Sequence, residues 1–552
     1  MTPAPLALTL AEPATARETV ATLIRDRVAS RLFAADDSLW GAEAQPEASI
    51  RLGWVRPAGL AGSTEALIDD IEKLRDELAS AGVDRIVLSG MGGSSLAPEV
   101  ITRRYGVPLF ILDSTHPARV RAALGDDLSR TALVVSSKSG STVETQSHRE
   151  TFEAAFVAQG IDPATRIIVV TDPGSPFEAS ALERGNRVFL ADPHVGGRYS
   201  ALTAFGLVPS GLAGANIRAL LAEATGCLDA LAQDSEENPA LRLAAALFAG
   251  LPSRFALVLT PGAEPGGAHS DAATDWGLPD WIEQLVAEST GKLGLGVLPV
   301  SVHPGSPETA GHLASTAQLL AVSPLPSHAS GDRLAGPLGA QFLCWEAATA
   351  VLGRLMNINP FDQPDVESAK TATRALLGQD GHAAPALGTL TDIAGAAILR
   401  APAGELPVDA KQLWTGLFAQ LPANGYLAVQ AYLDAGSPLA PELDRLLEEL
   451  AERLDVPVTL GWGPRFLHST GQLHKGGPAV GVFLQLTDEA PEDLAIPGSA
   501  QSYHELLTAQ AAGDASVLVA RGRPVLSLRF ADPASGVRAL RAALEALPGS
   551  AR

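Results

Sequence analysis

The stretch from residue 85 to 142 constrains the fold most, because it contains three short apolar runs that each break into small polar residues. These runs lie at 85–90, 108–112 and 131–135, and a helical pattern follows each of them. Continuous apolar runs without polar alternation are typical of parallel strands that helices cover on both faces. With a further strand at 166–170, the pattern predicts a doubly wound α/β domain.

The loops that follow the first and third runs are rich in glycine and serine. The third one, residues 136–142 with the sequence SSKSGST, offers five hydroxyl groups and one ammonium group. Such a loop lets backbone N–H groups close around an oxyanion, with the positive end of the next helix behind it. We therefore expect this loop to bind a phosphate group.

The length and charge of the chain limit its number of domains, its class of partners and its location. A chain of 552 residues is too long for one core, and 46% hydrophobic with 18% charged residues describes a globular protein. The net charge of −22 argues against nucleic acid and anionic membranes as partners. The sequence contains no long apolar run and no signal-peptide pattern. We expect Cys227 and Cys344 to be buried free thiols, as in a reducing compartment. The expected location is therefore cytoplasmic.

The second half of the chain repeats the alternation of strands and helices. A strand at 255–260 precedes a helix that ends at Gly291 and carries Glu288 in its last turn, where a carboxylate opposes the helix dipole. A helix at 341–356 follows, and another at 366–375 carries Lys370. The final part contains a glycine-rich loop, 463–477, whose two histidines have no metal-ligand spacing. We interpret that loop as a second anion-contacting loop and expect neither a metal nor another cofactor.

Five motifs occur in one order between residues 85 and 370: GMGGS, SKSGST, GGRYS, QLVAESTGK and NPFDQPDVESAK. Together they resemble the glucose-6-phosphate isomerase family, which is built on two sugar-isomerase (SIS) domains. The loop RFLHSTGQLHKGGP at 465–478 further resembles the isomerase half of bacterial fusions with transaldolase, although nothing here resembles the transaldolase half. The resemblance implies two doubly wound SIS domains with parallel sheets and a C-terminal α/β region. The expected boundaries are 1–54 for an N-terminal helical segment, 55–215 and 216–404 for the SIS domains, and 405–552 for the C-terminal region.

By this resemblance the chain interconverts glucose 6-phosphate and fructose 6-phosphate through an enediolate, in glycolysis and gluconeogenesis. Glu288 would be the base, Arg198 would stabilise the enediolate, and Lys370 with a histidine would open the sugar ring. Substrate contacts would come from Gly93, Ser94, Ser137, Lys138, Ser139, Thr142 and Gln284.

The ring-opening histidine departs from the family pattern, in which it lies between the glutamate and the lysine in sequence. The family motif carries Gln four residues after that histidine, and His468 has Gln472 at this spacing. We therefore assign His468, with His474 as the second choice. In the family this histidine comes from a partner subunit, so a homodimer is an expectation that the altered order leaves open.

Two alternatives stand beside this function. A dual isomerase would also accept mannose 6-phosphate, which differs only at carbon 2. A sugar-phosphate sensor would keep the phosphate loop without the chemistry. The joint presence of Glu288, Arg198 and Lys370 disfavours the sensor.

Overall fold

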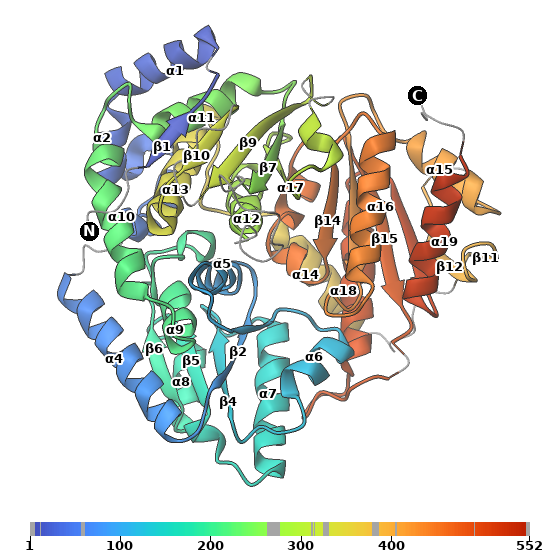
Figure 1. Cartoon of the computed structure of the whole chain (residues 1–552), viewed down its shortest axis with the longest axis horizontal. Helices are drawn as coiled ribbons and strands as arrows, with labels where there is room; N and C mark the ends of the chain where they lie inside the picture. The colour runs from blue at the N-terminus through green and yellow to red at the C-terminus, as the bar shows by residue number, and fades with distance from the viewer. Residues whose placement is uncertain are drawn as a thin grey trace.

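The computed structural model describes residues 6–11, 13–56, 61–261, 277–310, 313, 315–323, 331–377, 386–402, 406–490 and 492–547. Three sheets with helices around them form an α/β fold (Figure 1). We call the parts built on them the first unit, the second unit and the C-terminal unit, in the order in which the chain forms them.

The first unit holds a five-stranded, fully parallel sheet in the order β3-β2-β4-β5-β6. Its strands are β2 (Arg85–Gly90), β3 (Phe110–Leu112), β4 (Thr131–Ser136), β5 (Ile167–Thr171) and β6 (Arg187–Leu190). Every residue of β4 and β5 is buried, as the apolar runs predicted. Since β3 lies on one side of β2 and β4 on the other, the chain reverses direction across the sheet there. Ligands of such sheets bind outside the carboxyl ends of the strands at this reversal.

The second unit holds a five-stranded sheet in the order β1-β10-β9-β7-β8, in which only β1 is antiparallel. The strands are β1 (Ala7–Thr9), β7 (Ala256–Pro261), β8 (Leu298–Ser301), β9 (Ala317–Ser323) and β10 (Arg333–Ala335). Strand β1 brings the beginning of the chain to the edge of this sheet, where it pairs with β10. The N-terminal segment therefore contributes a strand as well as the helix expected from its sequence.

The C-terminal unit holds a six-stranded sheet in the order β11-β12-β16-β15-β13-β14. Its strands are β11 (Gly388–Leu390), β12 (Ala396–Arg400), β13 (Tyr426–Tyr432), β14 (Val458–Trp462), β15 (Gly481–Asp488) and β16 (Val525–Phe530). The four strands from β16 to β14 are parallel, and β13 and β15 are buried along their whole length. This unit has its own apolar core, which includes Trp414 and Phe530.

Helices cover the faces of all three sheets, and 3₁₀ turns occupy several loops. The α-helices are α1 (Ala14–Arg25), α2 (Val28–Phe33), α3 (Gln45–Ala48), α4 (Ala61–Ser80), α5 (Leu96–Tyr105), α6 (Pro117–Leu124), α7 (Val143–Ala158), α8 (Pro176–Glu183), α9 (Ala204–Leu212), α10 (Ile217–Ala232), α11 (Pro239–Gly250), α12 (Leu278–Thr290), α13 (Leu338–Leu355), α14 (Val366–Leu377), α15 (Ala410–Phe418), α16 (Ala440–Arg453), α17 (Gly471–Gly476), α18 (Tyr503–Ala520) and α19 (Pro533–Glu545). The 3₁₀ turns are η1 (Asp37–Trp40), η2 (Gly53–Val55), η3 (Gly92–Ser94), η4 (Pro163–Thr165), η5 (Gly197–Tyr199), η6 (Pro307–Ala310) and η7 (Arg465–His468).

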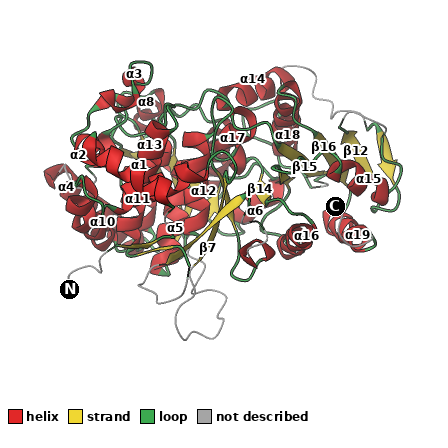
Figure 2. Ribbon diagram, turned by 90° about the horizontal axis from the view of Figure 1, so that it is seen from above, coloured by secondary structure: helices red, strands yellow, loops and turns green. Residues whose placement is uncertain are grey.

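The three units meet around α12, α14 and α17, which lie near the middle of the molecule in Figure 1. Seen from above, the C-terminal unit with β12, β16 and α19 forms one end, and α2 and α4 lie at the other (Figure 2). Helix α12 ends where the sequence predicted, at Gly291. No helix within the described ranges is long and apolar enough to cross a membrane.

Candidate active site

The predicted phosphate loop, residues 137–142, connects β4 to the N-terminus of α7 at the reversal point of the first sheet. Gly140 has φ +71° and a β-carbon there would lie 2.3 Å from Phe177, so only glycine fits this turn. The Gly140 N–H donates to Ser137 Oγ at 3.1 Å, and Ser139 Oγ lies 2.7 Å from Ser141 Oγ. Thr142 occupies the N-cap position of α7, but its side chain makes no capping hydrogen bond. Its hydroxyl is therefore not committed to the helix.

The loop after β2 lies beside this phosphate loop and contains η3 with Gly93 and Ser94. A β-carbon on Gly93 would come within 2.0 Å of the Gly197 carbonyl oxygen, so the close contact between η3 and η5 requires glycine. Ser94 is buried. The structure thus brings both glycine-rich loops and the turn before Arg198 together at one edge of the sheet.

Lys138 points from the phosphate loop toward an acidic partner. Its Nζ lies 2.7 Å from Asp172 Oδ2 and donates to the Val195 carbonyl oxygen at 2.8 Å. Burial lowers the pKa of this ammonium, although the Asp172 hydrogen bond and charge partly counter the effect. Asp172 therefore forms an ion pair with Lys138, the residue whose positive charge we expected to bind the phosphate.

Glu288 lies in the last turn of α12 with 9% of its surface exposed. Its Oε1 lies 3.1 Å from Arg198 Nη1, and its Oε2 accepts from Gln284 Nε2 at 3.1 Å. Gln284 is one helical turn earlier, so both side chains leave the same face of α12. Gln284 Nε2 also donates to the His468 carbonyl oxygen at 2.8 Å. Two predicted site residues, Arg198 and Gln284, thus contact Glu288, and Gln284 also contacts the backbone of a third, His468.

Arg198 is buried, and its guanidinium links the first unit to the second. Besides Glu288, it donates to Ser289 Oγ at 2.8 Å and to Gln363 Oε1 at 2.9 Å. Its Nη2 donates to the carbonyl oxygens of Pro360 and Asp362 at 2.8 and 2.9 Å. This planar fork fixes the position of the only charge in contact with Glu288 among the described residues.

His468 ends η7 in the C-terminal unit and reaches the first unit. Its Nε2 lies 3.1 Å from Oε1 of Glu144, which is in the first turn of α7, next to the phosphate loop. Burial raises the pKa of Glu144, but the charge and hydrogen bond of His468 outweigh it, so the pKa lies below its ordinary value. An ionised carboxylate therefore holds the imidazole of His468.

His474, the second choice for ring opening, lies apart from these groups. It packs among Tyr426, Phe466 and Phe483, and its Nδ1 lies 2.9 Å from the Tyr426 hydroxyl. Burial lowers the pKa of His474 to about 3, helped by the charges of Lys475 and Arg523. This histidine stays neutral in an aromatic cluster, so the geometry favours His468.

Lys370 belongs to α14 by its backbone, and its side chain lies outside the described residues. The segment before α14 is nevertheless well anchored. Gln472 Nε2 donates to the Gly291 carbonyl oxygen and to Asp365 Oδ2, and Gln472 Oε1 accepts from the Asp365 N–H. The Gln that marked the histidine motif thus joins α17 to the end of α12 and to the start of α14.

The residues of the site that sequence reasoning missed include Glu144 and Lys292. Glu144 carries a weak signal, because a glutamate in the first turn of a helix is common and favourable. Lys292 follows Gly291, and its Nζ lies 2.7 Å from Asp362 and contacts the Asn359 carbonyl oxygen. Burial lowers the pKa of Lys292 to about 8. The sequence signal for Lys292 was its place in the same motif as Glu288. Lys292 anchors residues 359–362, whose carbonyl oxygens include those that accept from Arg198.

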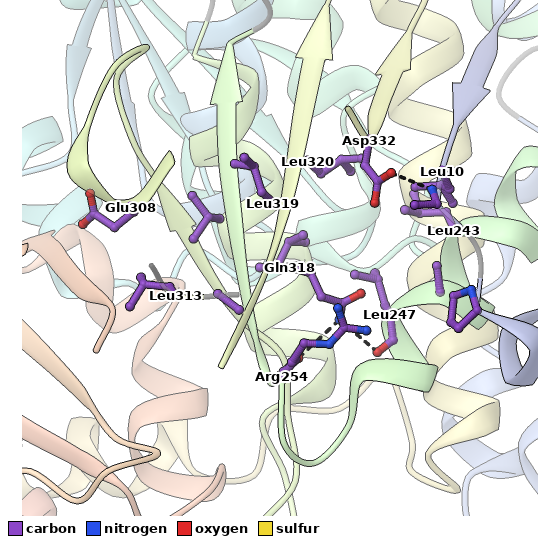
Figure 3. A pocket seen from close by; sticks show the side chains of 16 residues that line it. Leu10, Leu243, Leu247, Arg254, Glu308, Leu313, Gln318, Leu319, Leu320 and Asp332 are labelled. Atoms are coloured by element: carbon purple, nitrogen blue, oxygen red, sulfur yellow. Dashed lines mark hydrogen bonds between the residues drawn. The ribbon is translucent and has the colours of Figure 1, made fainter. Parts of the chain in front are cut away.

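Two cavities lie away from these side chains. One, of about 300 Å³, opens between α11 and the second sheet and is lined by Leu243, Arg254, Gln318 and Asp332 (Figure 3). The other, of about 420 Å³, lies where the three units meet and includes Glu283 and Arg465. None of the predicted site residues whose side chains are described lines either cavity. Within the described part of the chain, no cluster of three or more His, Cys, Asp or Glu side chains could hold a metal ion.

No family model matches the chain, but individual proteins do. A probable glucose-6-phosphate isomerase of Haloarcula marismortui is 29% identical over 368 residues, which cover 56% of this chain and 81% of that protein. The glucose-6-phosphate isomerase of Rubrobacter xylanophilus is 29% identical over 391 residues, which cover 58% and 88%. These relatives support the resemblance that the five motifs carry.

Solved structures show the same fold. A hypothetical protein of Thermus thermophilus superposes with a TM-score of 0.56 at 24% identity, over 68% of this chain and 100% of that one. A glucose-6-phosphate isomerase of Chlamydia trachomatis gives 0.52 at 18% identity, over 68% and 88%. The predicted α/β fold with parallel sheets is confirmed. By sequence, the chain is similar to glucose-6-phosphate isomerases, and by structure it shares the α/β fold of these two solved proteins.

Proposed function

We propose that this chain is a glucose-6-phosphate isomerase, an aldose–ketose isomerase that interconverts glucose 6-phosphate and fructose 6-phosphate. The observation that carries the proposal is the convergence of Glu288, Arg198, Gln284 and His468 beside the glycine-rich loops of the first unit. Relatives with this activity in their names match over more than half of the chain. The same activity places the protein in glycolysis and gluconeogenesis.

The roles of the side chains follow from their chemistry. His468, with Lys370, transfers protons during ring opening, because imidazole exchanges protons near neutral pH. Glu288 then moves a proton between carbons 1 and 2 of the open sugar. Arg198 supplies positive charge beside Glu288, where the negative charge of the enediolate develops. The loop with Ser94, and residues 137–142, bind the phosphate.

A coupled assay on the purified chain tests this function directly. We expect fructose 6-phosphate to form from glucose 6-phosphate, and the reverse reaction to proceed as well. Chelators should leave the rate unchanged. A chain that binds the sugar phosphate without turning it over would be a sensor, and the proposed function would be wrong. Mannose 6-phosphate, assayed separately, measures the selectivity at carbon 2.

Thr142→Ala should weaken the binding of both glucose 6-phosphate and inorganic phosphate. The Thr142 hydroxyl is not used as a helix cap, and a hydrogen bond to a charged group contributes about 1.5–3 kcal/mol, or roughly 10- to 150-fold in affinity. Titration calorimetry with each ligand measures the loss. Weaker binding of the sugar phosphate alone would contradict the phosphate-loop assignment.

Asn216→Ala is the matched control for Thr142→Ala. Asn216 does cap its helix, because its side chain accepts from the Ala219 N–H at the start of α10. The change should lower the free energy of unfolding by about 0.5–2 kcal/mol and leave phosphate binding unaltered.

We also propose that one chain is sufficient for activity, whether or not the protein forms a homodimer. His468 contacts Glu144 and Gln284 of its own chain, so no partner subunit has to supply the histidine. A mixture of Glu288→Gln and His468→Ala chains, unfolded and refolded together, should therefore show only the sum of their residual activities. Recovery of a fraction of wild-type activity would show that sites are shared between subunits.

The sugar phosphate is the partner that the site supports. The net charge of −22 makes nucleic acid and anionic membranes unfavourable partners. Cys227 and Cys344 are both free and buried, which fits a reducing compartment. We propose a cytoplasmic location on that basis.

A further inference from the structure

Gln510 reaches the site from α18, although nothing in its local sequence marks it. Its side chain is buried, with 3% of the residue exposed. Its Nε2 donates to Glu144 Oε1 at 2.7 Å, and its Oε1 accepts from Thr115 Oγ1 at 2.7 Å. Both partners belong to the first unit, and they lie 366 and 395 residues away in the sequence.

The same carboxylate oxygen of Glu144 receives two donors from the C-terminal unit, Gln510 Nε2 and His468 Nε2. The order Thr115, Gln510, Glu144, His468 is therefore a continuous chain of hydrogen bonds. The carboxylate of Glu144 fixes the orientation of the Gln510 amide, because it only accepts hydrogen bonds and a flipped amide would place its oxygen against it. The amide thus presents its N–H groups to Glu144 and its oxygen to Thr115.

We propose that Gln510 is a positioning residue for ring opening, which orients Glu144 so that its carboxylate holds the imidazole of His468. This inference rests on the proposed function and names a part of the site outside the five motifs. Gln510 does not touch the substrate, and it acts through Glu144. A buried carboxylate needs hydrogen-bond donors to remain charged. Without Gln510, Oε1 of Glu144 keeps the contact with His468 but loses the shorter of these two hydrogen bonds.

The surroundings of Glu144 allow a pH readout. The titratable groups that face it are His468, His148 and Tyr432. Burial lowers the pKa of His148 to about 4 and raises that of Tyr432 well above its ordinary value, so neither changes charge near neutral pH. Loss of the Gln510 donor should raise the pKa of Glu144. Because the ionised form is the active one, the acid limb of the pH profile should then move to higher pH.

Gln510→Met in the full chain tests the role, since methionine keeps the length and removes both hydrogen bonds. Gln485→Met is the matched control. Gln485 is equally buried in the C-terminal unit, and its amide bonds the Ala511 carbonyl oxygen and Ser527 Oγ, both at 3.0 Å, without touching the site. Thr115→Val is a milder second variant, which leaves Gln510 in place but frees its amide.

We expect Gln510→Met to lower kcat on cyclic glucose 6-phosphate by about 10- to 150-fold, the factor that one hydrogen bond to a charged group provides. KM should change less, and proton exchange from an open-chain analogue should stay near the wild-type rate. Thr115→Val should give a smaller loss of the same kind, and Gln485→Met none. Equal losses on both substrates, or an unmoved acid limb in both Gln510→Met and Thr115→Val, would overturn the role. An inactive wild-type chain would instead overturn the proposed function itself.

Discussion

Glu288→Gln is expected to abolish most turnover while the fold and substrate binding persist. A positioned base contributes about 10²- to 10⁴-fold in rate, and an amide cannot accept the proton. The fold should persist because Arg198 keeps its bonds to Ser289, Gln363 and two backbone carbonyl oxygens. Steady-state kinetics and ligand titration, run on the same preparation, measure the two effects separately.

Glu283→Gln is the control on the same helix. Burial raises the pKa of Glu283 to about 8, so this carboxyl is largely neutral at pH 7, and the amide resembles it in charge and size. Glu283 lines the cavity where the three units meet and takes no part in the contacts around Glu288. We expect its replacement to change kcat by no more than a few-fold. Turnover of Glu288→Gln at a comparable rate would remove Glu288 from the role of base.

His468→Ala should slow turnover of the cyclic substrate by about 10²- to 10⁴-fold, the usual contribution of a general acid or base. Ring opening needs a proton delivered to the ring oxygen, whereas an open-chain analogue needs no such step. Proton exchange from that analogue, followed by loss of label into solvent, should therefore decrease far less. The ratio of the two losses is the quantity that identifies the step.

The control for this histidine is His194→Ala, which removes an exposed imidazole. It should leave both rates unchanged. Equal losses on both substrates in His468→Ala would move His468 out of ring opening. No loss on either substrate would make His468 a structural residue. His474 would not take over its role, because it is buried among aromatic rings.

The parts of the site that the sequence predicts are those with a local signal. An apolar strand that breaks into glycine and serine already specifies both a turn and an anion-binding loop, as at 136–142. Glu288 was distinguished by its unfavourable place in the last turn of a helix. His468 was found by its spacing from Gln472. In the structure, that glutamine donates a hydrogen bond to the Gly291 carbonyl oxygen at the end of α12. The division of the chain at 54, 215 and 404 stays a prediction.

The parts that could not be predicted depend on contacts between distant segments. Gln510 lies in a helix whose sequence is ordinary, and its importance comes only from Glu144, 366 residues earlier. The pairing of β1 with β10 likewise joins residues more than 300 positions apart, and a three-residue strand has no periodicity to detect. The ion pair between Lys138 and Asp172 also requires β4 and β5, which precede these two residues, to be adjacent and in register. Sequence pattern reports local geometry, and these features are long-range.

The same distances determine when the protein becomes active during its synthesis. Glu144 is bonded by His468 and Gln510, which follow it by 324 and 366 residues. At a translation rate of about 5–20 residues per second, roughly 20–70 s separate the emergence of Glu144 from that of Gln510. Until then the nascent chain carries a complete phosphate loop, and the face that receives the C-terminal unit stays hydrated. A ribosome stalled before residue 468 should thus display a chain that can hold phosphate but cannot open a sugar ring.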